Sequence, residues 1–247
     1  MDLQEKIDLN NLPKHVAVIM DGNGRWAKKK GGLRIFGHQS AITAVRDTVE
    51  AAAELGIEYL TLYAFSTENW SRPQYEVNAL MQLLVSTIRK ETGTLTKNNI
   101  RLKAIGDINA LPQACRNELL EAMALTEGNN RMTLVLALSY SGRWDITQAM
   151  KAMGQDLAQG KLQVDDIREE TVNNYLATKN MPDPELLIRT SGELRLSNFL
   201  LWQLAYSELY ITDLLWPDFR KQHLYEALLS YQRRERRFGK ISEQLTK

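Results

Sequence analysis

The chain has 247 residues, 44% of them hydrophobic, and a formal net charge of +1. This length fits one large domain or two small ones, and the hydrophobic content suffices for a globular core. A charge so close to zero argues against nucleic acid as a partner. The single cysteine, Cys115, excludes a disulfide within the chain, and no apolar run reaches membrane-spanning length. The N-terminus has no signal-peptide pattern, so we expect a cytoplasmic protein.

Strand-like and helix-like segments alternate along the chain. Apolar or β-branched runs predict strands at 15–20, 59–65, 100–105, 132–139, 185–190 and about 206–211. Helical periodicity predicts helices around 41–53, 77–88, 112–128, 143–157, 167–177 and 219–237 or beyond. This alternation predicts a mainly parallel sheet in a single α/β domain over 1–247, with residues 1–12 flexible.

The end of the first predicted strand carries the most informative pattern. Asp21 follows the strand directly, and Gly22 and Gly24 come next, where glycine lets the backbone approach a ligand closely. Arg25 and the basic stretch 28–34 add positive charge. A carboxylate among these cations would repel an anion unless a metal bridged the two, so the pattern predicts a divalent metal that holds a phosphate.

The other predicted strand ends carry polar residues of the same kinds. They lie at 66–73, 140–145, 189–199 and 207–208. In a parallel sheet these junctions converge on one edge, where ligands bind in open α/β folds. Arginine forks, small hydroxyls and the carboxylates of Asp21 and Glu208 suit two diphosphates and a divalent metal.

Several of these segments match the motifs of a known family. In order from residue 13 to residue 240, the chain contains HVAVIMDGNGRWA from His15, GH from Gly37, FSTENWSRP from Phe65, SGRWD from Ser141, LIRTSGE from Leu187, RLSNFLLWQ from Arg195 and RRFG from Arg236. This ordered set resembles the cis-prenyltransferases, and most closely the bacterial undecaprenyl diphosphate synthases.

The resemblance implies a fold and an activity. The fold is a parallel sheet flanked by helices around an apolar tunnel, in a homodimer. The activity is head-to-tail condensation of isopentenyl diphosphate onto an allylic diphosphate such as farnesyl diphosphate, with Mg2+ as cofactor and a cis double bond in each added unit. The implied product is undecaprenyl diphosphate, the carrier precursor for cell-wall polysaccharide. Release of such a lipid implies peripheral association with the inner membrane face.

The resemblance also implies two groups of substrate-binding residues. The group around the allylic diphosphate comprises Gly22, Asn23, Gly24, Arg25, Trp26, Arg34 and His38. The group around isopentenyl diphosphate comprises Ser66, Thr67, Glu68, Trp70, Arg72, Arg189, Arg195, Leu196 and Ser197.

Catalytic and metal-binding roles fall on fewer residues. Asp21 would be catalytic and hold the metal, with Glu208 as a second ligand. Asn69 would act at the reacting atoms, although a neutral amide is a weak base and the departing diphosphate or Asp21 is the better proton acceptor. Arg237 and Gly239, in a tail over 233–247 at the dimer interface, would reach the partner subunit's site.

Other interpretations of the same patterns are weaker. The glycines after the first strand also match a loose dinucleotide fingerprint, but no acid ends a second strand about 20 residues on. The acidic run 165–169 looks like a diphosphate–magnesium motif of all-helical prenyltransferases, but here it opens a helix and is better explained as a cap. A shorter product, a non-catalytic binding subunit and a dinucleotide-dependent oxidoreductase are the alternative functions.

Overall fold

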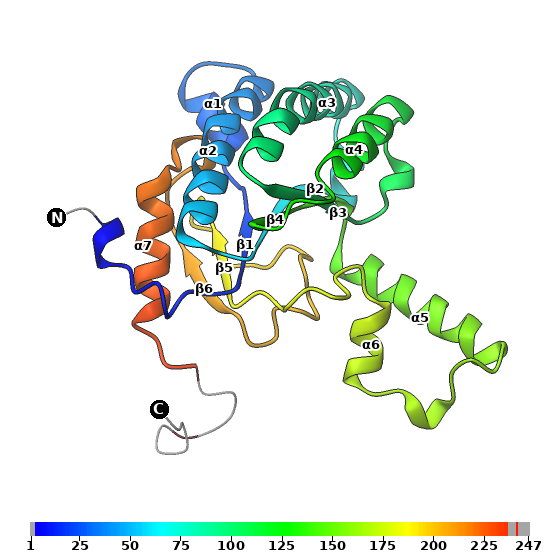
Figure 1. Ribbon diagram of the computed structural model, residues 1–247. Helices are drawn as coiled ribbons and strands as arrows, with labels where there is room; N and C mark the ends of the chain where they lie inside the picture. The colour runs from blue at the N-terminus through cyan, green and yellow to red at the C-terminus, as the bar shows by residue number, and fades with distance from the viewer. Residues whose placement is uncertain (1–2, 237–240, 242–247) are drawn as a thin grey trace.

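Six parallel strands form one sheet in the computed structural model, which describes residues 3–236 and 241 (Figure 1). The strands are β1 (His15–Ile19), β2 (Tyr59–Ser66), β3 (Ile100–Ile105), β4 (Met132–Tyr140), β5 (Leu186–Arg189) and β6 (Glu208–Ile211). Their order is β3-β4-β2-β1-β5-β6, and each neighbouring pair is parallel. The α/β fold that the sequence predicts is confirmed, and the strand ends agree with the prediction within two residues.

Helices flank the sheet over the described residues. They are α1 (Asn23–Lys29), α2 (Arg34–Leu55), α3 (Gln74–Lys97), α4 (Gln113–Leu125), α5 (Gly142–Ala158), α6 (Glu169–Tyr175) and α7 (Lys221–Gln232). Figure 1 shows α2, α3, α4 and α7 over one face of the sheet, whereas α5 and α6 project from the side of the molecule.

The central strand β1 contributes to two separate cores because its side chains alternate between the faces of the sheet. Val16 and Val18 join a large cluster with residues of α2, α3, α4 and α7. Ala17 and Ile19 join a smaller cluster on the opposite face, which includes Phe199. All five β1 residues are buried, which is why this strand reads as a continuous apolar run in the sequence.

One helix lies where the sequence indicates only a turn. Helix α1 has seven residues, includes Gly24 and ends in lysines, so its periodic signal is weak. Packing against α2 stabilises it: a Cβ at Gly37 of α2 would lie 2.0 Å from the carbonyl oxygen of Asn23. The two helices approach this closely because Gly37 has no side chain.

The two ends of the chain also differ from the expected pattern. Helix α7 ends at Gln232, at least five residues short of the predicted end at 237 or beyond. The described part of the segment 1–12 packs against α7. Ile7 is buried, and the Gln232 side chain donates hydrogen bonds to the carbonyl oxygens of Asp8 and Asn11.

Candidate active site

The strand register brings the predicted polar residues to one edge of the sheet. Ile19 of β1 pairs with Tyr63 of β2 and with Arg189 of β5, so the segments that follow these strands emerge side by side. Asp21 follows β1 and Arg189 ends β5. This is the carboxyl edge of the sheet, as the sequence predicts.

Asp21 lies in a network of hydrogen bonds. Its Oδ2 accepts from Nη2 of Arg189 at 2.9 Å, and its Oδ1 accepts from the backbone N–H of Gly22 at 2.7 Å. The carbonyl oxygen of Asp21 accepts from the Thr190 hydroxyl at 2.7 Å and from the backbone N–H of Trp216 at 3.0 Å. The carboxylate is one-third exposed, so it is fixed in position and still accessible to a ligand.

Gly22 is required by this arrangement for two reasons. Its φ of +106° lies in the region that residues with a side chain rarely adopt. In addition, a Cβ at this position would lie 2.8 Å from Cδ2 of Leu215. The glycine therefore turns the chain after β1 while the segment around Leu215 packs directly against it.

Arg189 is the buried cation of the site. Its side chain is 3% exposed, and its Nη1 donates to the Ser197 hydroxyl at 2.8 Å and to the Arg195 carbonyl oxygen. Its Nε is buried and has no hydrogen-bond partner among the described residues. Arg189 also borders the cavity, and a guanidinium group held in this position fits an anionic ligand.

Two more exposed arginines are held by one acid. Glu193 forms ion pairs with Arg25, at 3.1 Å, and with Arg195. Arg25 also donates a hydrogen bond to the Ser191 hydroxyl. Exposed pairs of this kind contribute little to stability, so a phosphate could replace Glu193 as the partner of either arginine at small cost.

A buried acid links the two predicted substrate groups. Glu76 of α3 is 4% exposed and accepts a hydrogen bond from Nη1 of Arg72 at 3.1 Å. Nη1 of Arg34 lies 4.0 Å from the same carboxylate. The motif analysis does not single out Glu76; the only signal available in the sequence is its position four residues after Arg72.

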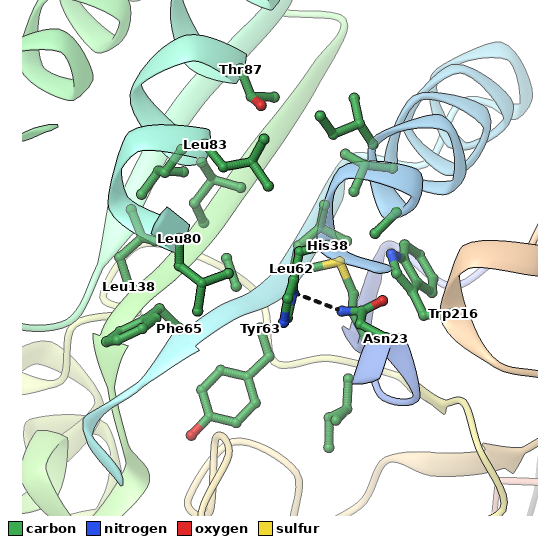
Figure 2. A pocket seen from close by; sticks show the side chains of 18 of the residues that line it. Asn23, His38, Leu62, Tyr63, Phe65, Leu80, Leu83, Thr87, Leu138 and Trp216 are labelled. Atoms are coloured by element: carbon green, nitrogen blue, oxygen red, sulfur yellow. Dashed lines mark hydrogen bonds between the residues drawn. The ribbon is translucent and has the colours of Figure 1, made fainter. Parts of the chain in front are cut away.

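His38 lies beside these cations and is neutral. Burial, together with the positive charge of Arg72, lowers its pKa to about 4. Nδ2 of Asn23 lies 3.3 Å from Nδ1 of His38, as Figure 2 shows. If the Asn23 amide donates to Nδ1, the ring proton is on Nε2, where it can be donated to a ligand oxygen.

The loop after β2 is fixed by its own side chains. Oδ1 of Asn69 accepts from the backbone N–H of Ser66 at 3.1 Å, and Oε1 of Glu68 accepts from Nδ2 of Asn198 at 2.7 Å. Nε1 of Trp70 donates to the Ser139 hydroxyl at 2.9 Å. The amide oxygen of Asn69 is thus engaged in shaping the loop, and Trp70 anchors the loop to β4.

A large cavity of about 960 Å³ begins at these polar residues. It continues between the sheet and the helices α2 and α3, and reaches residues near the start of β3 and β4. Figure 2 shows Leu62, Leu80, Leu83 and Leu138 facing this space, with Asn23 and His38 nearby. The apolar part of the lining includes Ile42, Val45, Val49, Leu62, Leu80, Leu84, Ile88, Leu102, Leu134, Leu136 and Leu138.

Most of the predicted site residues border this cavity. Those that do are Asp21, Gly22, Asn23, Gly24, Arg25, Arg34, His38, Ser66, Glu68, Asn69, Arg72, Arg189, Arg195 and Ser197. Trp26, Thr67, Trp70 and Leu196 do not line it. Trp26 instead packs on Phe36 and donates to Asp218 at 2.8 Å. Arg237 and Gly239 lie outside the described residues.

The prediction that Glu208 shares an edge of the sheet with Asp21 is wrong. Glu208 begins β6 and pairs in register with Leu186, the first residue of β5. Leu186 is in register with Val16, five residues before Asp21, which corresponds to about 15 Å along a strand. Glu208 binds Nη1 of Arg234 at 2.8 Å at the amino edge of the sheet. Asp21 and Glu208 of one chain therefore cannot share a metal ion.

Of the two predicted metal ligands, only Asp21 lies at the carboxyl edge of the sheet. The described residues contain no cluster of three or more His, Cys, Asp or Glu side chains suited to a metal ion. Mg2+ is commonly bound by one or two carboxylates together with substrate phosphates and water. An accessible carboxylate beside arginines that favour a diphosphate fits this mode of binding.

The family model described as "Putative undecaprenyl diphosphate synthase" matches residues 19–239. The chain belongs to this family. It is 55% identical over 234 residues to the isoprenyl transferase of Chlorobaculum tepidum, covering 95% of this chain and 88% of that protein. It is 52% identical to a ditrans,polycis-undecaprenyl-diphosphate synthase ((2E,6E)-farnesyl-diphosphate specific) of Pasteurella multocida, covering 96% of this chain and 99% of that one.

Solved structures of the family share the fold. A lavandulyl diphosphate synthase from Lavandula x intermedia, in complex with dimethylallyl diphosphate, has a TM-score of 0.92 at 39% identity, over 94% of this chain and all of that one. A probable undecaprenyl diphosphate synthase from Campylobacter jejuni has a TM-score of 0.77 at 33% identity, over 93% and 100% of the two chains. Because family members carry different product names, the fold identifies a prenyltransferase and the product has to be argued from the cavity.

Proposed function

We propose that this prenyltransferase condenses isopentenyl diphosphate with farnesyl diphosphate and forms undecaprenyl diphosphate. The observation that carries the proposal is the two-part cavity: arginines and Asp21 at one end, and an apolar lining along the rest. The polar end suits two diphosphates. The apolar part suits a growing hydrocarbon, whose burial contributes about 0.8 kcal/mol per methylene group.

The two substrate groups are assigned to two parts of the polar end. Asn23, Arg25, Arg34 and His38 would hold the allylic diphosphate. Arg189, Arg195 and Ser197 would hold the diphosphate of isopentenyl diphosphate. The buried carboxylate of Glu76 contacts Arg34 and Arg72, so it would fix the positions of the two groups relative to each other.

In the reaction the bond between the allylic carbon and its diphosphate breaks, and that carbon bonds to the terminal alkene carbon of isopentenyl diphosphate. A proton is then lost from the added unit, at the carbon between its diphosphate-bearing carbon and the former alkene carbon that bears the methyl group. Mg2+ held by Asp21 would neutralise charge on the leaving diphosphate when it is bound. Arg25, Arg34 and the Nε2–H of His38 would donate to the same oxygens as negative charge develops.

The proton acceptor is assigned by exclusion. Asn69 is neutral, and its amide oxygen already accepts from the Ser66 backbone. His38 is a weak base because burial lowers its pKa to about 4. We therefore assign proton transfer to an oxygen of the departing diphosphate or to the carboxylate of Asp21.

The direct test uses purified protein with labelled isopentenyl diphosphate, farnesyl diphosphate and Mg2+. We expect polyprenyl diphosphates of undecaprenyl length when the products are sized by chromatography. Products that stop after a few additions would support a shorter-chain synthase in place of this proposal. An absence of condensation in protein that binds both substrates would support a non-catalytic subunit.

A homodimer is part of the proposal because Glu208 is too far from Asp21 within one chain. If Glu208 is a metal ligand, it acts in the site of a second copy. We expect Asp21→Ala and Glu208→Gln variants to be inactive alone and to recover up to about a quarter of wild-type activity after subunit exchange, since half of the dimers would be mixed with one intact site each. No recovery after confirmed exchange would exclude a shared site.

A further inference from the structure

An exposed loop of unusual composition lies next to the cavity. The basic-apolar loop, residues 28–36, connects α1 to α2 and lies at the periphery of the molecule (Figure 1). Leu33 is 80% exposed and Phe36 is 47% exposed. Lys28 and Lys29 are also exposed. Large apolar side chains that stay exposed between lysines are typical of surfaces that contact another phase or molecule.

The conformation of the loop keeps the apolar side chains outward. The backbone N–H of Gly32 donates to the Ala27 carbonyl at 2.9 Å, which closes the turn after α1. The Phe36 ring lies 5.6 Å from the ring of Trp26, and Nζ of Lys30 lies 5.8 Å from the same Trp26 ring. Leu33 therefore projects from a folded turn whose base is formed by the tilted rings of Trp26 and Phe36.

The charge of this region has one sign. Residues 22–46 contain six Lys and Arg residues and no Asp or Glu. The acids that face it are Asp218, which accepts from Trp26, and the partners of its three arginines. Arg25 pairs with Asp21 and Glu193, Arg34 pairs with Glu76, and Arg46 pairs with Glu91. Within the part of the chain that the structure describes, Lys28, Lys29 and Lys30 form no salt bridge. Their charge is thus free to act on an external anionic surface.

We propose that the basic-apolar loop binds the surface of an anionic lipid bilayer. Lysines near a negatively charged bilayer surface each contribute to attraction, and inserted apolar side chains add to it. The inference deepens the proposed function, since a polyprenyl product has to leave for a bilayer. The loop is well placed for that step, because Gly24, Arg25 and Arg34 on either side of it line the cavity.

A bilayer explains the surface better than a protein or nucleic acid does. The exposed apolar tip is confined to one short loop, whereas stable protein interfaces bury about 800 Å² on each partner. Leu33 and Phe36 would have no evident use in binding a phosphate backbone. No helix in the described part of the chain is long and apolar enough to cross a bilayer.

The test is sedimentation of the full chain with vesicles, without substrates, so its result does not depend on the proposed reaction. We compare vesicles of phosphatidylcholine alone with vesicles that also contain phosphatidylglycerol. We expect binding only to the anionic vesicles, and loss of that binding at high salt. The double variant Lys28→Gln/Lys29→Gln should bind about thirty-fold more weakly. Leu33→Ser should reduce binding about tenfold.

Matched controls separate local effects from loss of charge or apolar surface in general. Lys151→Gln/Lys179→Gln removes the same charge from exposed positions on the α5–α6 side of the molecule. Val164→Ser removes an apolar side chain that is 72% exposed. Both controls should bind as the wild type does. Equal binding to the two kinds of vesicle, or equal loss in the controls and the loop variants, would overturn the proposal.

Discussion

The two ends of the cavity both contain paired charges, but in different proportions. At the end beside Asp21, the described lining residues include five arginines (Arg25, Arg34, Arg72, Arg189 and Arg195) and three carboxylates (Asp21, Glu68 and Glu76). Toward the start of β3 and β4 they include two arginines (Arg46 and Arg131) and three carboxylates (Glu50, Glu54 and Glu91).

This difference distinguishes a site for an anionic ligand from a part of the cavity lining whose charges are already paired. An excess of guanidinium groups over carboxylates attracts an anion. At the far end, Arg46 binds Glu91 through Nε at 3.0 Å, and Lys221 binds Glu50 and Glu54, so the charges neutralise one another. Such pairs join α2 to α3 and to α7 without creating a site for a free anion.

The largest expected effect comes from removing Asp21. We expect Asp21→Ala to lower kcat at least about 1000-fold, because metal-assisted departure of the diphosphate contributes several kcal/mol in comparable sites. Steady-state kinetics with both substrates and Mg2+ measure the loss. Asp156→Ala, on α5 away from the cavity, is the matched control, and near-normal kcat in Asp21→Ala would contradict the assignment.

Arg195→Lys tests the assignment of the two diphosphates. We expect the KM for isopentenyl diphosphate to rise about tenfold while that for farnesyl diphosphate changes less, because a lysine cannot replace a forked donor. Arg89→Lys, on an exposed part of α3, controls for a change of side chain as such. If only the KM for farnesyl diphosphate rose, the two sites would have to be exchanged.

Glu76→Gln tests whether the buried acid joins the two groups. Loss of its charge leaves Arg34 and Arg72 without their shared partner, so we expect the KM values for both substrates to rise about three- to tenfold with a smaller change in kcat. Glu76→Asp should recover part of this loss. A change in thermal stability with unaltered KM values would indicate a purely structural role.

The pH dependence of stability examines His38 directly. Its folded-state pKa, lowered to about 4, is below the ordinary value of 6.5 for an unfolded chain. The unfolded state therefore binds the proton first, and stability decreases as the pH falls from about 6.5 to about 4, by up to about 1.4 kcal/mol per pH unit. Denaturant titrations at several pH values measure the slope, which should be shallower in His38→Asn. An unchanged slope would mean that the pKa of His38 is the same in the folded and unfolded states.

The smallest expected effect lies at the far end of the cavity. Replacing both partners in Arg46→Leu/Glu91→Leu should extend the apolar lining and shift the product distribution by about one isoprene unit, since apolar burial favours further elongation. Total turnover should change little. Chromatographic sizing against wild-type products measures the shift, and an unchanged distribution would show that the pair does not limit chain length.

The sequence predicts the sheet and most of the carboxyl edge for a clear physical reason. Buried central strands are continuous apolar runs, and parallel strands bring their ends together. Asp21 and Arg189 follow directly from that rule. The position of Glu208 does not follow from it. Strand β6 is short and half-exposed, and it begins at Glu208, about two residues later than the sequence predicts. Whether a polar residue precedes or follows such a strand decides which edge it occupies.

Other features depend on contacts between distant segments. Glu76 becomes part of the site only when α3 packs beside α2, and nothing near it in the sequence indicates Arg34 as a partner. The apolar residues of α3 have the same periodicity whether they fill a core or line a cavity. Sequence patterning therefore identifies the helix and its apolar face, while the space between the helices depends on the packing of the whole domain.

The hydrogen bonds around Asp21 have a consequence for the synthesis of the protein. Asp21 leaves the ribosome long before Arg189, Thr190 and Trp216, on which its position depends. Strand β1, which precedes Asp21, completes its pairing only after β5 has been synthesised. Contacts so distant in sequence form slowly because a long loop has to close first. A nascent chain that has not reached Trp216 therefore lacks the assembled centre, and chains truncated before this residue should be inactive even if β1 to β4 are folded.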